Sequence, residues 1–266
     1  MNTVKTIVIT GIILMVIGIA GSFLSYQFMD HSSSTVKETV ASGHIAHLKI
    51  LAKNEHVTII PVKNRSEITV ELTGKGTKKL NTELDLHVHD DTLSIKTKRL
   101  KKLFQINFFG GTRELNIYLP EKLYQSLEVS LDNGELTVND LSIKNVKTDS
   151  NNGRIRMKHM VSDHIHVAVS NGRVHLDHVE GKITGRSDNG AVFLKTDTLD
   201  RSIDWKTDNG NIKIETEGKP ENAILDLQTK NGRVSVFSSD DWNTVIGDGE
   251  YLIKLRANNG NIYIHD

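Results

Sequence analysis

The chain has 266 residues, in which 33 Lys and Arg balance 33 Asp and Glu, and it contains no Cys. Balanced charge argues against nucleic-acid binding as the main role. The missing Cys excludes disulfide scaffolds, thiol nucleophiles and Cys-ligated zinc.

The first element is an uncharged, largely apolar segment at residues 6–29. As a helix it would span about 36 Å, enough to cross a hydrocarbon core of about 30 Å. Lys5 lies on the short N-terminal side, so we expect residues 1–5 in the cytoplasm and the C-terminal domain outside a single-pass cell membrane protein. A cleaved signal peptide is the alternative, because Gly18-Ile19-Ala20 is a small-x-small triplet. The apolar run continues beyond that triplet, which favours a transmembrane anchor.

Two stretches precede the regular part of the chain. Residues 30–43 are rich in Ser and Thr and lack periodicity, which indicates a stalk. Residues 44–128 alternate apolar and polar residues, and we expect an irregular β region that caps the domain and protects its edge. Six strands are predicted in it, at 44–52, 56–62, 67–72, 83–89, 92–97 and 114–119.

From residue 129 to 266 the dipeptide Asn-Gly recurs seven times at spacings of 18 to 28 residues. Self-similarity with a period near 20 residues indicates a repeat architecture. The Asn residues are Asn133, Asn152, Asn171, Asn189, Asn209, Asn231 and Asn259.

Each repeat has apolar residues three and five positions after its Asn, with an unconstrained residue between them. In one repeat these are Ile212, Lys213 and Ile214. A second alternating stretch precedes each Asn, as in Ile203-x-Trp205. This period of two predicts two short strands per repeat, each with one buried face, and an all-β fold.

Two architectures fit these columns. Asn-Gly is the strongest two-residue hairpin signal, which would give a hairpin meander or sandwich. In a parallel β-solenoid (β-helix-like), Asn-Gly would lie at a corner, where Gly supplies a positive φ and successive Asn residues stack in a ladder. Only the solenoid explains why the same offsets stay apolar in every period, because each turn covers the next. We therefore predict a parallel β-solenoid ectodomain after a single N-terminal transmembrane helix.

The membrane segment, the stretch 115–138 and the repeated D/N-N-G-x-Φ-x-Φ units, where Φ is apolar, together carry a family resemblance. They resemble the bacterial "putative adhesin" family of unknown function that includes LiaG-like cell-envelope proteins. The resemblance covers residues 44–266. It implies a β-solenoid-like fold, a binding, adhesin-like or scaffolding role at the cell envelope, and an association with envelope stress. It implies no catalytic residues.

One segment departs from the surrounding composition, at residues 96–111. Clustered basic residues beside aromatic ones suggest contact with an anionic lipid, a cell-wall polymer or another envelope protein. A solubilising turn next to a strand is the other interpretation. The predicted contact residues are Lys98, Arg99, Lys101, Lys102, Phe104, Phe108 and Phe109.

Histidines form a second group of candidates. His87 and His89, and likewise His164 and His166, would share one face of a strand. In a solenoid, His159 and His178 would stack beside Asp140, because all three lie seven positions after an Asn. Such a column could hold Zn²⁺ or Cu²⁺, although His is also an ordinary occupant of a polar face. We assign no metal and no cofactor.

Acidic and basic columns allow two further hypotheses. Asp188 and Asp208 would lie one rung apart, close enough for a retaining glycosidase pair or half of a Ca²⁺ site, but Asp before a turn is common. Arg154, Arg173 and Arg233 each follow an Asn by two positions and could line an anion-binding face or a solvated one.

Nucleotide-binding, serine-hydrolase and zinc-protease motifs are absent from the sequence. We expect a binding protein and not an enzyme; the alternative is a carbohydrate-active enzyme with acidic residues on the solenoid face.

Overall fold

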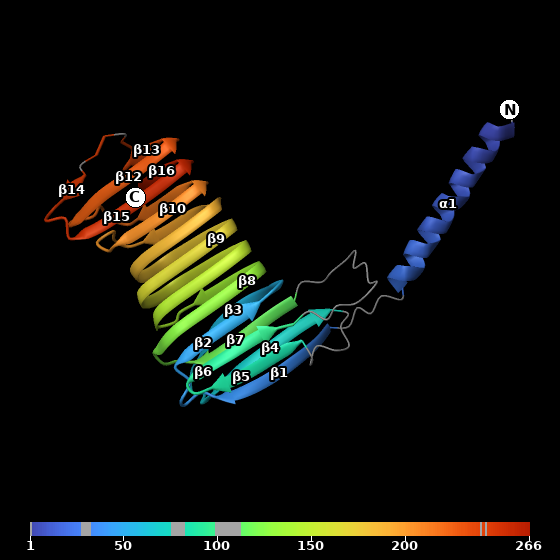
Figure 1. The fold of residues 1–266 in the computed structure, drawn as a ribbon, viewed down its shortest axis with the longest axis horizontal. Helices are drawn as coiled ribbons and strands as arrows, with labels where there is room; N and C mark the ends of the chain where they lie inside the picture. Colours follow the sequence, from blue (N-terminus) through green and yellow to red (C-terminus); the bar gives the residue numbers. More distant parts are fainter. Residues whose placement is uncertain (1, 28–32, 76–82, 99–112, 240, 243) are drawn as a thin grey trace.

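The structure is a computed structural model that describes residues 2–27, 33–75, 83–98, 113–239, 241–242 and 244–266. These residues form one helix, α1 (Asn2–Gln27), and a 16-stranded sheet (Figure 1). The strands are β1 (Ser33–Ala41), β2 (His47–Ala52), β3 (Glu55–Val62), β4 (Glu67–Lys75), β5 (Leu84–His89), β6 (Thr92–Thr97), β7 (Arg113–Pro120), β8 (Tyr124–Asn139), β9 (Ile143–Thr196), β10 (Ile203–Asn209), β11 (Ile212–Thr216), β12 (Ala223–Asn231), β13 (Val234–Val236), β14 (Val245–Ile246), β15 (Tyr251–Asn259) and β16 (Ile262–His265).

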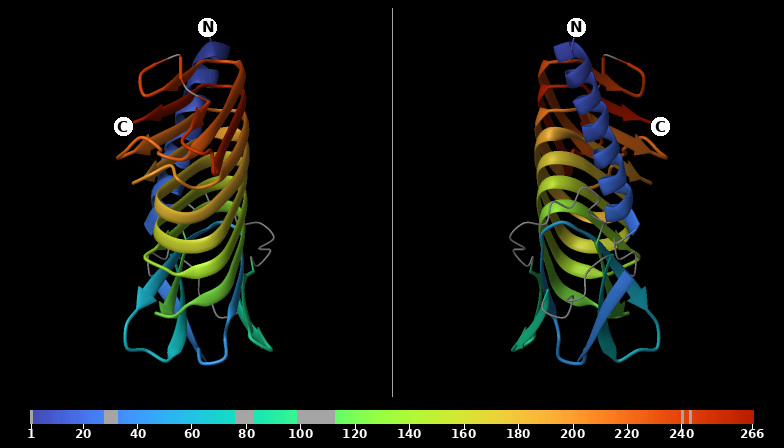
Figure 2. Two further views of the ribbon diagram at one scale, coloured as in Figure 1. Left: turned by 90° about the vertical axis from the view of Figure 1, so that its left-hand side faces the viewer. Right: turned by 90° about the vertical axis from the view of Figure 1, so that its right-hand side faces the viewer.

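The repeats form stacked rungs. Each rung consists of a strand, a corner at Asn-Gly and a second strand, and Figure 2 shows the rungs as open, U-shaped bands along one axis. Neighbouring rungs pair in parallel with Asn opposite Asn, as Asn133 with Asn152 and Asn189 with Asn209. Three rungs follow one another without interruption in β9, which therefore spans 54 residues. The parallel solenoid is confirmed, and the sheet is not a hairpin meander.

The Asn side chains form the predicted ladder. The Nδ2 group of Asn152 donates a hydrogen bond of 3.1 Å to Oδ1 of Asn133, and the amide of Asn171 donates to Asn152 at 3.0 Å. The ladder also extends one rung further than the seven repeats, because Asn133 donates to Oδ1 of Asn54 at 2.8 Å. The side-chain amide of each Asn thus forms a hydrogen bond with that of the next Asn along one edge of the solenoid.

Glycine is required at the corners mainly because successive rungs come close there. A Cβ on Gly172 would lie 1.7 Å from the carbonyl oxygen of Gly153, and one on Gly190 would lie 1.8 Å from that of Gly172. The positive φ expected for these glycines is found at Gly134, Gly172, Gly210 and Gly260. Lack of space for a Cβ is the requirement common to all seven corners.

The predicted apolar columns form the core between the two strands of each rung. Ile212 and Ile214 are each 1% exposed, whereas Lys213 between them is exposed. Val234 is the one member of the two columns that is only half-buried. It lies in β13, on the last rung of the stack, where only β16 pairs with it. Val236, two residues further along β13, is 3% exposed, so one neighbouring rung is enough to bury some column positions of the terminal rung.

The rungs at the C-terminal end do not follow chain order. The rung of β15 and β16 lies between the rung of β10 and β11 and the rung of β12 and β13. Accordingly, Asn259 donates to Asn209 at 2.9 Å, and Asn231 donates to Asn259 at 2.8 Å. The chain skips one rung position, forms the outermost rung, and returns to fill the gap.

The N-terminal strands close the other end with mixed pairing. β2 and β3 form a rung that pairs in parallel with β8 on one side and with β6 and β7 on the other. β4 then adds antiparallel to β7, β1 to β4, and β5 to β6. The six predicted strands correspond to β2–β7, with ends that differ by three residues or fewer. The division at residues 128 and 129 stays a prediction, because β8 pairs with strands on both sides of it.

The stalk prediction at residues 30–43 is wrong for residues 33–41. These residues form β1, which pairs with β4 along its whole length, from Ser33 opposite Lys75 to Ala41 opposite Glu67. Val36 is the only buried residue of β1. An edge strand held mainly by backbone hydrogen bonds needs no apolar alternation, so its sequence carried no strand signal.

The apolar segment forms α1. Residues Lys5–Ser22 make a helix long and apolar enough to cross a membrane, judged by length and composition. None of these side chains is buried in the structure. Contacts within the chain therefore do not account for the apolar character of the helix.

Candidate ligand-binding surface

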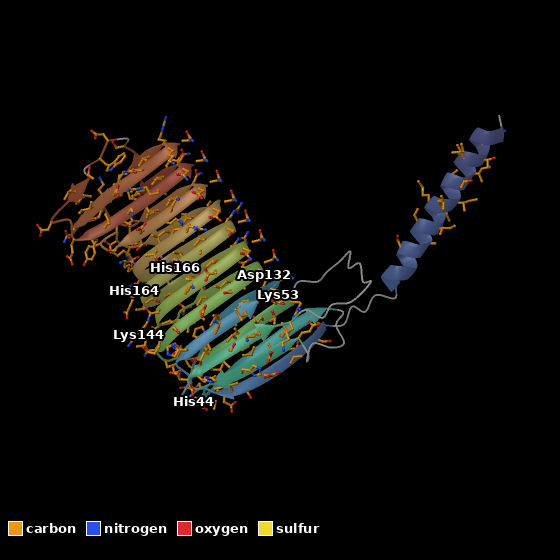
Figure 3. The ribbon with its side chains drawn as sticks, in the orientation of Figure 1. His44, Lys53, Asp132, Lys144, His164 and His166 are labelled. Atoms are coloured by element: carbon orange, nitrogen blue, oxygen red, sulfur yellow. The ribbon has the colours of Figure 1, made fainter. Side chains whose placement is uncertain are left out.

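A shallow groove of about 470 Å³ crosses four rungs on the outer face of β8 and β9. Its floor is formed by residues of the buried columns, and its polar rim comes from the alternating, outward positions. Figure 3 shows His164 and His166 on the flank of the stack away from Lys53 and Asp132, which lie at the corner end. The rim residues are Ser126, Glu128, Asn145, Lys147, His164, His166, Lys182 and Thr184.

The repeat period explains why residues far apart in sequence meet here. Ser126 lies opposite Asn145, and Glu128 lies opposite Lys147. His164 and His166 follow Asn145 and Lys147 by one 19-residue period. The Nδ1 atom of His166 lies 3.0 Å from Oγ1 of Thr184, one rung further on. Outward positions of consecutive rungs thus line up across the sheet.

The groove carries an excess of positive charge. Its single carboxylate, Glu128, accepts a hydrogen bond from Nζ of Lys49 at 3.0 Å. Lys147 lies 3.8 Å from Asp149, at the limit of an ion pair. Lys182 and the His164 ring have no ion-pair partner among the described residues. Lys182, which is unpaired within the described part of the chain, the long-range pairing of Lys147 and the two imidazoles make the groove suited to an anionic ligand.

A second hollow, of about 420 Å³, lies beside the Asn ladder. Arg154 and Arg173 line it, as the repeat offset predicted. Glu135 lies 3.3 Å from Arg154 and 2.5 Å from Arg156, so the carboxylate compensates part of this charge. The groove on β8 and β9 is therefore the stronger candidate for anion binding.

Most of the predicted contact segment lies outside the described residues. This applies to Arg99, Lys101, Lys102, Phe104, Phe108 and Phe109. Lys98 is described: its side chain is 60% exposed, and Nζ lies 2.6 Å from Oδ2 of Asp85. That hydrogen bond lowers the pKa of Asp85. The contact role of the segment stays a prediction.

Each member of the predicted carboxylate pair has a basic partner of its own. Asp188 lies 3.3 Å from Nε of Arg186, and Asp208 lies 3.6 Å from Nζ of Lys206. Asp208 also accepts a hydrogen bond of 2.7 Å from Asn258. Each carboxylate has its own cation, which does not favour the unequal protonation that a glycosidase pair requires.

The His pairs differ in their surroundings. His87 lies 3.1 Å from Asp85, and His89 lies 3.0 Å from Asp90, so these two rings have separate partners. The stacking of His159 and His178 is as predicted: their ring centroids are 5.7 Å apart, and Nδ1 of His159 lies 3.1 Å from Oδ1 of Asp140. The sequence did not indicate that carboxylates from the next two rungs would also approach His178.

Comparison with known proteins gives a family and a set of similar folds. The family model described as Toastrack DUF4097 matches residues 45–168 and 137–265. A "putative cell adhesion protein" from Clostridium sporogenes is 14% identical, with a TM-score of 0.44 over 88% of this chain and 99% of that one. A "putative adhesin" from Bacteroides fragilis is 10% identical, with a TM-score of 0.47 over 87% of this chain and 97% of that one. No curated protein matches the chain.

Proposed function

The chain belongs to the Toastrack DUF4097 family, and we propose that it is a membrane-anchored, extracytoplasmic binding protein that recognises a phosphate-bearing component of the bacterial cell envelope. α1 anchors the chain, with its N-terminus in the cytoplasm. The solenoid presents the groove on β8 and β9 to the ligand. LiaG-like membership and a role in envelope stress are part of the proposal and rest on the resemblance alone.

The observation that carries this proposal is the excess of basic over acidic side chains in the groove. Lys147, His164, His166 and Lys182 line it, and its one carboxylate is already engaged by Lys49. A phosphodiester chain has a repeating negative charge that can meet Lys147 and, two rungs further on, Lys182. Lipid headgroups and wall polymers share this chemistry, so the experiment must distinguish them.

The test uses the full chain in nanodiscs of uncharged, zwitterionic lipid. One arm titrates soluble polyglycerol phosphate, and the other measures co-flotation with phosphatidylglycerol vesicles. In whichever arm the parent chain binds, Lys147→Gln combined with Lys182→Gln should weaken binding by roughly thirtyfold at low salt, because each surface cation contributes about 1 kcal/mol. Raising the salt concentration should reduce the difference.

The matched control removes two positive charges elsewhere. Lys206→Gln with Lys213→Gln leaves the groove intact and should retain nearly full affinity. Equal weakening in the two double variants would show that net charge, and not the groove, determines binding. Absence of binding in both arms would refute recognition of phosphate.

A further inference from the structure

A second feature of the solenoid lies where the second strand of a rung ends. At this position Asp140, His159 and His178 all have positive φ, of 54°, 48° and 49°. This left-handed backbone turns the chain toward the next rung. It also directs successive side chains at this corner into one column.

His178 is the centre of a polar cluster in that column. Its Nε2 atom lies 2.9 Å from Oδ1 of Asp197 and 3.9 Å from Oε1 of Glu217. The three residues come from three consecutive rungs, because Asp197 follows Thr196, which pairs with Thr216, and Glu217 comes next. Their ligand atoms all lie within 4.8 Å of one another.

The other nitrogen of the ring is held by a carboxylate. Nδ1 of His178 lies 2.5 Å from Oδ1 of Asp177, and Lys158 lies 3.6 Å from the other oxygen of that carboxylate. A carboxylate at Nδ1 leaves Nε2 as the ring nitrogen available to a metal ion.

This arrangement leaves Nε2 facing two carboxylates. Nε2, Oδ1 of Asp197 and Oε1 of Glu217 therefore converge on one point at the surface. A carboxylate that orients a ligating His through its second nitrogen is the usual outer shell of a zinc site.

We propose that His178, Asp197 and Glu217 bind a Zn²⁺ ion on the surface of the solenoid. Imidazole nitrogens and carboxylate oxygens are both zinc ligands, and zinc ligands at about 2.1 Å from the metal lie roughly 3.4 Å from one another. The distances of 2.9 and 3.9 Å require only small side-chain rotations to reach that value. The imidazole ligand disfavours Ca²⁺ and Mg²⁺, which prefer oxygen alone.

The ligand set differs from the column of His159, His178 and Asp140 considered from the sequence. His159 is engaged by Asp140 at 3.1 Å and serves here as a neighbour outside the site. Because the three ligands come from separate rungs, a bound ion would link the rungs and stabilise the folded chain.

The test measures Zn²⁺ binding to the full chain in detergent micelles after removal of metal with a chelator, by isothermal titration calorimetry. The chain has 12 His, so weak background sites are expected and variants must be compared. His178→Ala should lose one equivalent of the tightest binding, and Asp177→Asn should weaken it by 10- to 100-fold. His159→Ala, the matched control from the same column, should retain it.

A second measurement guards against a folding defect. Asp197 and Glu217 are 69% and 67% exposed, so Asp197→Asn with Glu217→Gln should leave the thermal midpoint of the metal-free chain unchanged. The same double variant should lose the rise in midpoint that Zn²⁺ gives the parent chain. If His178→Ala binds Zn²⁺ like the parent, or if His159→Ala loses as much as His178→Ala, the proposed site is wrong.

Discussion

At the scale of single residues, the corner between β2 and β3 shows what the ladder requires. Asn54 continues the ladder, but Glu55 occupies the place of the usual Gly. Its side chain is 1% exposed and accepts hydrogen bonds from the backbone N–H groups of residues 53 and 54 and from Thr97. Arg113 lies 3.3 Å from its other oxygen. The corner between β2 and β3 therefore has room for the Glu55 side chain, whereas the corners of the repeats have no room for a side chain at the equivalent position.

Tyr124 provides a pH-dependent contribution to stability. It is completely buried, and its hydroxyl donates a hydrogen bond of 3.0 Å to the carbonyl of Pro120. Burial raises its pKa to about 12, compared with about 10 in an unfolded chain. The contribution of the neutral phenol is complete below pH 10 and is lost as pH rises toward 12, by roughly 2–3 kcal/mol.

Urea unfolding of the parent chain and of Tyr124→Phe at pH 8, 10 and 12 tests this expectation. The variant lacks the buried hydroxyl, so its unfolding free energy should fall less between pH 10 and 12 than that of the parent. Other Tyr and Lys residues titrate in both proteins and cancel in the comparison. Parallel losses would show that Tyr124 does not ionise on unfolding in this range.

At the scale of strands, side-chain volumes in one column compensate between neighbouring rungs. Trp205 in β10 lies opposite Gly185 in β9 and is 2% exposed. A Cβ on Gly185 would lie 2.2 Å from Cζ3 of Trp205. The indole thus occupies the space that a side chain at residue 185 would need.

Gly185→Val should therefore destabilise the chain by about 1–3 kcal/mol or more through overpacking. Trp205→Leu alone should also destabilise it, by leaving a cavity. Combined, the two changes should cost less than the sum of the separate ones, as denaturant unfolding of the four chains in a double-mutant cycle would measure. Strict additivity would mean that the two positions do not share this volume.

The strands of the repeats could be predicted because every rung repeats the same burial. Ile212 and its counterparts occupy the same offset in each period, so seven copies reinforce one signal. β1 could not be predicted in this way, because its residues are bound by the backbone and only Val36 is buried. The sequence did not predict the groove either, because Lys147 and Lys182 come to line one surface only when their rungs have stacked.

At the scale of the whole molecule, the proposed topology has a direct test. The chain contains no Cys, so any maleimide labelling of a single-Cys variant comes from the introduced thiol. Lys230→Cys places it at an exposed position of β12, where a membrane-impermeant maleimide added to intact cells should label it. Asn2→Cys, on the cytoplasmic side of α1, should be labelled only after permeabilisation. Labelling of residue 2 but not residue 230 in intact cells would reverse the orientation.

The order of the C-terminal rungs was beyond the sequence analysis. The only signal was a spacing of 28 residues between Asn231 and Asn259, longer than the other intervals. All rungs carry the same apolar columns, so the pattern does not distinguish which rung packs on which. The connection between β13 and β15 includes β14, which pairs antiparallel with β12.

This exchange of rungs affects how the domain can be completed as the chain is synthesised. In a solenoid built in chain order, each rung docks on the one that was synthesised just before it. Here the rung of β12 and β13 emerges first, but its native parallel neighbour is the later segment of β15 and β16. Vectorial folding from the N-terminus therefore stops one rung short, and the end of the stack closes by insertion of a later segment instead of by addition.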